Sequence, residues 1–203
     1  MLESDATAAS NDLERQLALA ARSAPEGDSR AFEQLILLHQ RKILANCRYL
    51  ARDESNYEDL AQEVFVKAYF GIKTFEGNSS FGHWLRRIKV NHCLNHLKRN
   101  EGRFPVDIAD EAILQEERLQ VPPIAESRLD AADQRNRIHT ILGMMPIGLR
   151  IPLIMRDMDD FSYDEVASAL GLGLSAVKMR IKRARELFRK NYKPAEGRVA
   201  HES

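Results

Sequence analysis

Apolar residues recur at steps of three and four along most of this chain, which is the period of a helix with one buried side. We find no convincing run in which apolar and polar residues alternate, as they do in a strand. The pattern therefore predicts an all-α protein. In the first half it predicts four helices: one from near Ser10 with Leu13, Leu17 and Ala20 on one side, one capped by Asp28 and reaching Leu50, one from Ser55 or Asn56 to Phe70, and one from Ser79 or Ser80 to Lys98.

Four more helices are predicted in the second half, at residues 129–145, 149–158, 163–170 and 175–190. Pro146 ends the first of these, and Pro152 is tolerable only in the first turn of the second. At residues 101–128 the helical period fades and prolines and acidic residues predominate, which predicts an extended linker. The predicted organisation is two small helical domains, residues 10–100 and 129–193, this linker between them, and a disordered tail at residues 194–203.

The composition suits a folded, soluble protein, since 44% of the 203 residues are hydrophobic and 30% are charged. No apolar run approaches the roughly 20 residues that span a bilayer. The N-terminus lacks the basic stretch and apolar core of a secretory signal. Because Cys47 and Cys93 are the only cysteines, a disulfide scaffold is not expected, and we expect a cytoplasmic protein.

The net charge of zero conceals a separation of charge along the chain. Residues 84–100 carry five Lys or Arg and no acid, and residues 178–193 carry eight Lys or Arg and one Glu. Between them, residues 101–130 carry eight acids and three arginines. Such blocks indicate interaction surfaces, although ordinary solvated helix faces have the same composition.

Residues 162–190 predict a helix-turn-helix. Ser162 and Glu165 fit a capping box, Gly171 can end the first helix, and Ser175 can cap the second. The inward positions, with two leucines expected in the angle between the helices, are Val166, Ala167, Leu170, Leu172, Leu174, Val177, Ile181, Ala184 and Phe188.

The outward side of the second of these helices is rich in cations. It carries Lys178, Met179, Lys182, Arg183 and Glu186, with Arg180 and Arg185 on the flanks. A helix of this width fits the DNA major groove, where an arginine that bonds guanine bidentately contributes about 1–3 kcal/mol of discrimination. The alternative is a basic amphipathic helix within a bundle.

Two helices of the first domain also carry polar stripes. Asp59, Gln62, Glu63 and Val66 fall on one side of the third predicted helix, which suits either a protein-docking surface or a solvated face. The fourth carries a stripe of cations, amides and one indole that suits single-stranded DNA, because unpaired bases stack on rings while cations follow phosphates. The residues of this stripe are Trp84, Arg87, Asn91, Asn95 and Lys98. Trp84 could equally belong to the core.

Other chemistry finds little support. His92 and His96 lie one helical turn apart, a spacing that can chelate zinc, but there is no matching second pair, so no metal is expected. No Ser-His-Asp set, phosphate-binding glycine loop or acid pair indicates catalysis, so neither an enzyme nor a cofactor is predicted. An operator-binding repressor would need a dimer interface or a ligand pocket, and the sequence indicates neither.

Several segments, in this order and spacing, resemble the extracytoplasmic-function (ECF) sigma factors. The segments that resemble region two of these proteins are Asp59–Tyr69, Phe75–Phe81 and Trp84–Asn91. The segment that resembles region four is residues 145–189, including Phe161–Ala167 and Arg180–Arg185. The resemblance covers residues 12–100 and 130–190. It implies a transcription initiation factor that directs RNA polymerase to promoters, reads the minus-ten and minus-thirty-five elements and aids DNA melting.

The resemblance implies a role for each matching position. The residues expected to dock on the clamp helices of the polymerase beta-prime subunit are Asp59, Gln62, Glu63 and Phe65. Those expected to capture a flipped base of the minus-ten element are Phe75, Asn78, Ser79, Ser80, Phe81 and Asn91, and the stripe described above adds Trp84 and Arg87 for the strand beside that base. Those expected to read the minus-thirty-five element are Lys178, Met179, Lys182 and Arg183, and those expected to grip its phosphates are Ser175, Arg180 and Arg185.

The resemblance also implies partners, and the sequence departs from the family's pattern at three places. The implied partners are core RNA polymerase, including its beta subunit, promoter DNA and an anti-sigma factor, with no small-molecule substrate. A membrane-bound anti-sigma factor would hold the protein at the inner membrane, and the family implies a stress response. Asp160 stands where many members have glycine, residues 145–148 lack the usual charged residues after the proline, and Pro152 is unusual.

Overall fold

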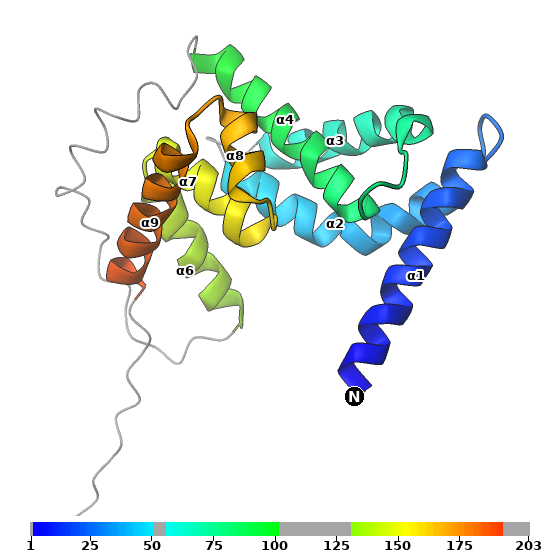
Figure 1. Cartoon of the computed structure of the whole chain (residues 1–203), viewed down its shortest axis with the longest axis horizontal. Helices are drawn as coiled ribbons and strands as arrows, with labels where there is room; N and C mark the ends of the chain where they lie inside the picture. The colour runs from blue at the N-terminus through cyan, green and yellow to red at the C-terminus, as the bar shows by residue number, and fades with distance from the viewer. Residues whose placement is uncertain (1, 51–55, 102–130, 193–203) are drawn as a thin grey trace, which may run out of the picture. The chain divides into compact units, whose positions relative to one another are not determined.

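The computed structural model of the chain describes residues 2–50, 56–101 and 131–192. All regular secondary structure within these ranges is helical, so the predicted all-α class is confirmed. The chain divides into two compact units, Met1–Asn100 and Glu101–Ser203. Figure 1 labels the helices of both. Nearly all of the predicted linker, and the whole predicted tail, lie outside the described residues.

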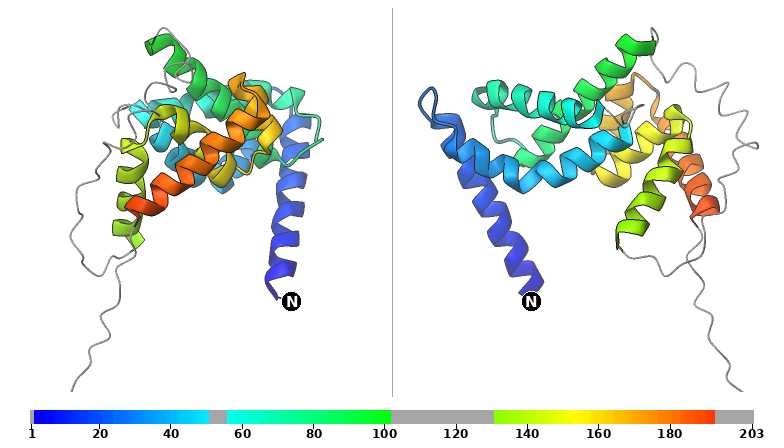
Figure 2. Two further views of the ribbon diagram at one scale, coloured as in Figure 1. Left: turned by 60° about the vertical axis from the view of Figure 1, so that its left-hand side comes forward. Right: turned by 180° about the vertical axis from the view of Figure 1, so that it is seen from behind.

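The first unit is built on a central helix. Its described elements are α1 (Leu2–Ser23), α2 (Arg30–Leu50), α3 (Tyr57–Gly71), the short 3-10 helix η2 (Ile72–Thr74) and α4 (Phe81–Glu101). Helix α2 packs against both α1 and α3. The N-terminal part of α1 projects away from the other helices of this unit (Figure 2).

Aromatic side chains fill the middle of the first unit. Phe81, the first residue of α4, is 1% exposed. Its ring centroid lies 5.9 Å from that of Phe75, 5.4 Å from that of Trp84 and 6.4 Å from that of Phe32 on α2. Edge-on and tilted contacts of this kind stabilise a core beyond the area they bury. We call these four residues the aromatic cluster.

Helix α1 differs from the prediction in its start and in its buried side. It begins before the predicted start, and Leu13 and Ala20 are exposed, whereas Ala18 and Ala21 are buried. The buried side is displaced because it includes Glu14, which accepts a hydrogen bond from the backbone of α4. A charged residue on the inward side breaks the apolar period from which the stripe was predicted.

The other helix starts in this unit follow the predicted capping residues. Ser80 precedes α4, and its Oγ accepts the N–H of His83 at 3.1 Å, which confirms the predicted cap. Asp28 Oδ1 accepts the N–H of Arg30 at 3.2 Å and so satisfies one of the free N–H groups at the start of α2. Asn56 directly precedes α3, although its side chain makes no capping bond.

The second unit packs its helices around α9. Its described elements are α6 (Ala131–Met144), α7 (Ile147–Leu153), the π-helical turn η4 (Ile154–Met158), α8 (Tyr163–Leu170) and α9 (Leu174–Asn191). Both α7 and α8 pack against α9. The largest fully buried apolar side chains of this unit are Leu149, Ile151, Ile154, Met155 and Ile181.

The prediction for Pro152 was wrong. Helix α7 begins at Ile147 because the Pro146 carbonyl accepts the N–H groups of Leu149 and Arg150, both at 2.9 Å, and this places Pro152 beyond the first turn. Proline has no N–H to donate, so the helical ladder is interrupted at this point. The chain then continues as the π-helical turn η4, in which the buried apolar side chains keep their place in the core.

The predicted helix-turn-helix is confirmed in α8 and α9. Glu165 N–H donates to Ser162 Oγ at 3.2 Å, and Ser162 N–H donates to Glu165 Oε2 at 2.8 Å, which completes the capping box. Gly171 ends α8 with φ 66°, in the left-handed region.

The start of α9 differs from the prediction. Gly173, not Ser175, is the N-cap, and its carbonyl accepts the N–H of Val177 at 3.1 Å. Leu174 is therefore the first helical residue and is 38% exposed, so it does not fill the angle between the helices. An extended glycine can begin a helix without a side-chain acceptor, and a search for capping side chains does not detect it.

Two glycines of this unit should respond oppositely to alanine. Gly171→Ala should lower the free energy of unfolding by about 1 kcal/mol, because a side chain disfavours the left-handed conformation at the end of α8. Gly143→Ala should raise it by about 0.5 kcal/mol, because Gly143 is helical and nothing lies within 4 Å of an added Cβ. Urea titrations of the two variants would test this. Equal effects would contradict the conformational argument.

Candidate nucleic-acid and protein-docking surfaces

The loop between η2 and α4 is anchored at both ends by buried rings. Phe75 is 6% exposed and Phe81 is 1% exposed, and both belong to the aromatic cluster. Their rings are therefore not available to stack on a base, and the expectation that they contact DNA directly is corrected: they fix the ends of the loop. The intervening residues Glu76–Ser80 are all exposed, and we call them the exposed loop.

The exposed loop and α4 together present the remaining candidate strand-binding side chains. Asn78 Nδ2 donates to Glu76 Oε2 at 2.8 Å, next to Gly77, which has φ 77°. On α4, Arg87 and Asn91 are exposed, and Trp84 is half-buried. The indole therefore packs in the core and also has an accessible part, so its contact with single-stranded DNA stays a prediction.

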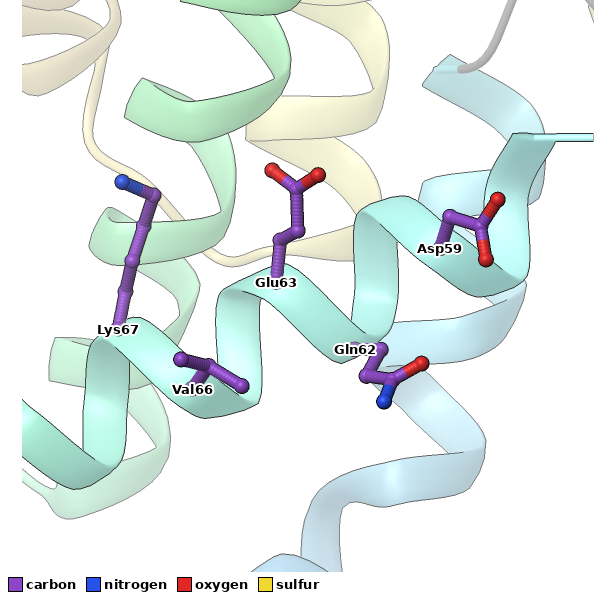
Figure 3. A pocket seen from close by; sticks show the side chains of 5 residues that line it. All are labelled: Asp59, Gln62, Glu63, Val66 and Lys67. Carbon is purple, nitrogen blue, oxygen red and sulfur yellow. The ribbon is translucent and has the colours of Figure 1, made fainter.

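The acid-and-amide stripe of α3 lies on the surface, as predicted. Asp59, Gln62 and Glu63 are exposed, and Val66 is 49% exposed. With Lys67 they line a pocket of about 490 Å³, and Figure 3 shows their side chains projecting from α3. This mixture of acid, amide and apolar groups on a rigid helix is suited to binding another protein.

Two aromatic residues extend this description of α3. Phe65, which the sequence assigned to docking, is half-buried. Phe70, to which it assigned no role, is 77% exposed, and its ring centroid lies 5.5 Å from that of Tyr69. From the apolar period alone, an exposed phenylalanine at the end of a helix cannot be distinguished from one in the core.

Helix α4 contributes a histidine to the edge of this surface. His92 Nε2 lies 2.8 Å from Glu63 Oε2, without hydrogen-bond geometry. Burial lowers the pKa of His92 below its ordinary value of 6.5, an effect to which Lys67, His96 and Arg99 add and which Glu63 opposes. The surroundings of His92 therefore favour its neutral form beside the candidate docking acids.

The sequence raised the spacing of His92 and His96 as a possible metal site. In the part of the chain that the structure describes, no group of three or more His, Cys, Asp or Glu side chains is placed to hold a metal ion. Cys47 and Cys93 are both buried and do not form a disulfide.

Helix α9 exposes part of the predicted recognition face. Lys178, Lys182 and Arg183 are exposed, and Met179 is 54% exposed. Lys178 also lies over the ring of Tyr163, with Nζ 5.9 Å from its centroid. Because the opposite side of α9 is buried, these four side chains share one outward row, as a helix that enters a groove requires.

Two of the predicted phosphate-binding arginines are placed otherwise. Arg180 is 7% exposed, so it belongs to the interior of the unit and not to the flank of the recognition face. Arg185 donates two hydrogen bonds to Asp157, at 2.9 and 2.5 Å, and this is the main cause that raises the pKa of its guanidinium. A bidentate pair of this kind holds α9 against η4. The third candidate, Ser175, is exposed.

Both units match one family of proteins. Residues 35–103 match sigma-70 region 2, and residues 135–188 match sigma-70 region 4. The RNA polymerase sigma-H factor of Pseudomonas aeruginosa is 35% identical over 173 residues, which cover 83% of this chain and 89% of that one. The ECF RNA polymerase sigma-E factor of Escherichia coli (strain K12) is 31% identical over 175 residues, which cover 83% and 90%.

Solved structures agree with these relatives. CnrH, in complex with the cytosolic domain of CnrY, has a TM-score of 0.55 and 26% identity, over 88% of this chain and 96% of that one. The sigma factor RpoE, in complex with the anti-sigma factor NepR from Bartonella quintana, has a TM-score of 0.56 over 79% and 95%. At 22% identity it shows the shared fold alone.

The chain therefore belongs to the sigma-70 family of RNA polymerase sigma factors, the initiation factors that direct the polymerase to promoters, and within it to the ECF type. The resemblance found in the sequence is confirmed. None of the helices in the described residues is both long and apolar enough to cross a bilayer.

The lowered pKa of His92 predicts a pH-dependent stability of the first unit. As pH falls below about 6.5, the unfolded chain binds a proton at His92 that the folded chain does not yet bind, so stability is lost in this window. His92→Gln should therefore show a smaller loss of melting temperature between pH 7.5 and 5.5 than the wild type.

Glu63→Gln supplies the opposing variant for the same melting experiment. Glu63 raises the pKa of His92 against the effect of burial, so its removal should widen the window and steepen the loss of stability with falling pH. If both variants follow the wild-type profile, His92 does not couple to folding.

Proposed function

We propose that this chain binds core RNA polymerase through α3 and reads the two promoter elements with its two units. The exposed row of Lys178, Met179, Lys182 and Arg183 on the second helix of a capped helix-turn-helix is the observation that carries the proposal. In it, Lys182 and Arg183 face bases of the minus-thirty-five element, and Arg183 bonds a guanine bidentately. Met179 supplies an apolar contact to the same groove.

The first unit supplies the complementary contact to the melted strand. The exposed loop, with Asn78, Ser79 and Ser80, and the exposed Asn91 offer the amides and hydroxyls that bond a flipped base. Arg87 follows the phosphates, and the accessible part of Trp84 stacks on a neighbouring base. Trapping an unpaired base drives melting without any chemistry on the protein.

The polymerase-binding surface is the stripe of α3. Asp59, Gln62 and Glu63 meet the clamp helices of the beta-prime subunit, and the exposed Val66 adds an apolar contact. Half-buried Phe65 of the same helix contributes the accessible part of its ring to this contact. The beta subunit is the further contact on the polymerase. Two DNA-reading units on one chain raise the effective concentration of the second contact once the first is made.

The regulatory partner we propose is an anti-sigma factor, acting in a stress response in the cytoplasm. A relative of known structure, RpoE, is seen with the anti-sigma factor NepR, and CnrH is seen with the cytosolic domain of CnrY. A membrane-bound partner of this class would hold the protein at the inner membrane.

The proposal is tested by transcription with purified core polymerase on promoters selected from a randomised library. The wild-type chain should confer defined start sites. Arg183→Ala should lower transcription from promoters with the selected minus-thirty-five element by roughly 5- to 150-fold, the effect of losing one bidentate base contact. A repressor would confer no starts on the core enzyme.

Arg189→Ala is the matched control, because it removes the same charge from the last turn of α9. It should weaken transcription modestly, and equally for selected and scrambled minus-thirty-five elements. If Arg183→Ala also acts equally on both, Arg183 contributes charge alone and not base recognition.

The pair between Asp157 and Arg185 predicts a separate effect on DNA affinity. Asp157→Asn should release Arg185 for phosphate contact, so non-specific duplex binding should strengthen and its logarithmic salt slope should steepen by about 0.9. Fluorescence anisotropy at several salt concentrations measures both quantities. Asp164→Asn, the same charge change at an exposed residue of α8, should leave the slope unaltered. An unchanged slope in Asp157→Asn would contradict the release.

A further inference from the structure

Helix α1 has no place in the roles described above, yet it forms hydrogen bonds with residues on both sides of the exposed loop. At the first end, Arg22 Nη1 donates to the carbonyl oxygen of Phe75 at 3.1 Å. At the second end, Glu14 Oε1 accepts the N–H of Gly82 at 2.8 Å. These are the two points at which the chain leaves and rejoins the aromatic cluster.

The contact at the first end is reciprocal. Lys73 of η2, just before the loop, donates from Nζ to the carbonyl oxygens of Arg22 at 2.9 Å and Ala24 at 2.6 Å. The last carbonyls of a helix have no partner within it, and a cation is favoured there. The end of α1 and the start of the loop are therefore tied by side chains from both segments.

The contact at the second end is closely packed. Glu14 Oε2 lies 3.4 Å from His39 Nε2, and the two side chains are only 16% and 17% exposed. The carboxylate faces the start of α4, where a negative charge is favoured. A Cβ at Gly82 would lie 2.7 Å from His39 Cε1, so any side chain at this position would require the His39 ring to shift.

We propose that Glu14 and Arg22 are positioning residues for base capture by the exposed loop. By fixing both ends of Glu76–Ser80, α1 keeps the loop in one arrangement before DNA arrives. A loop ordered in advance loses less conformational entropy on binding, so more of the interaction energy appears as affinity. The inference rests on the proposed function of the loop in capturing the minus-ten strand.

The test uses the full chain bound to core polymerase. The probe is a fluorescent single-stranded oligonucleotide carrying the non-template minus-ten element of a promoter selected as above. The variants are Arg22→Met, which keeps the length of the side chain but removes its donors, Arg22→Lys, which keeps one donor, and Glu14→Gln, which keeps an acceptor for Gly82. Arg15→Met is the matched control, because Arg15 is an exposed residue of the same helix.

Arg22→Met should weaken binding of this strand roughly five- to tenfold, as expected for the loss of one hydrogen bond that orders the loop. Arg22→Lys should restore most of the affinity that Arg22→Met loses, Glu14→Gln should keep most of the wild-type affinity, and Arg15→Met should match the wild type. Affinity for core polymerase and for duplex minus-thirty-five DNA should not change in any of them. A role in holding the unit together, and nothing more, would lower core affinity as well.

A double-mutant cycle identifies the route of the effect. If Arg22 acts through the loop, Arg22→Met should weaken binding little further in an Asn78→Ala background. Independent, additive losses, or wild-type strand binding by Arg22→Met, would overturn the positioning role while leaving the proposed function intact. Failure of the wild-type complex to bind the strand, or indifference to both Asn78→Ala and Asn91→Ala, would instead overturn base capture and the positioning role with it.

Discussion

The burial of Phe81 is the constraint on which the candidate single-strand surface depends. Its ring is held among those of Phe75, Trp84 and Phe32, so the residue that follows the exposed loop and begins α4 is fixed in the core. An exposed polar loop has little to bury and would otherwise pay the full entropy of ordering when it binds. Because both of its ends lie in the aromatic cluster, the polar tip can face solvent and still begin from a defined backbone. The indole of Trp84 serves both purposes, since it is half in the core and half on the surface.

Position decides which of the many cations can meet DNA. The run of basic residues in α9 suggests one continuous basic surface, but Arg180 is buried and Arg185 is paired with Asp157. In α4, Lys89 is fully buried. A cation within the core has already exchanged its water for protein partners, so it contributes to the fold and not to phosphate binding. The exposed cations Lys178, Lys182 and Arg183 cover a narrower part of the helix surface than the run of basic residues in the sequence suggests. A narrow row on one side of a helix suits a DNA groove better than a diffuse basic patch does.

What the sequence predicted well is local, and what it missed depends on distant neighbours. The capping box of Ser162 and the left-handed Gly171 involve residues within a few positions of each other, so their chemistry is legible in the sequence, and the structure confirms both. The candidate docking stripe of α3 followed equally from the helical period. The buried side of α1 was displaced because Glu14 bonds to α4, which is remote in sequence. The burial of Arg180 likewise depends on the packing of several helices, and no spacing within α9 reveals it.

The small number of exposed cations on α9 limits how tightly this helix can bind DNA without the polymerase. Even if all the exposed cations of α9 reached phosphates, they are only Lys178, Lys182, Arg183, Arg189 and Lys190. Five phosphate contacts correspond to a logarithmic salt slope of about −4 to −5, against slopes near −10 for proteins that bind duplex DNA strongly by themselves. Helix α9 by itself should thus hold DNA weakly at physiological salt. A second contact on the same chain, presented at a set distance by the polymerase, adds affinity through effective concentration and not through more charge. Weak separate units then make promoter choice depend on both elements together, because neither contact suffices without the other.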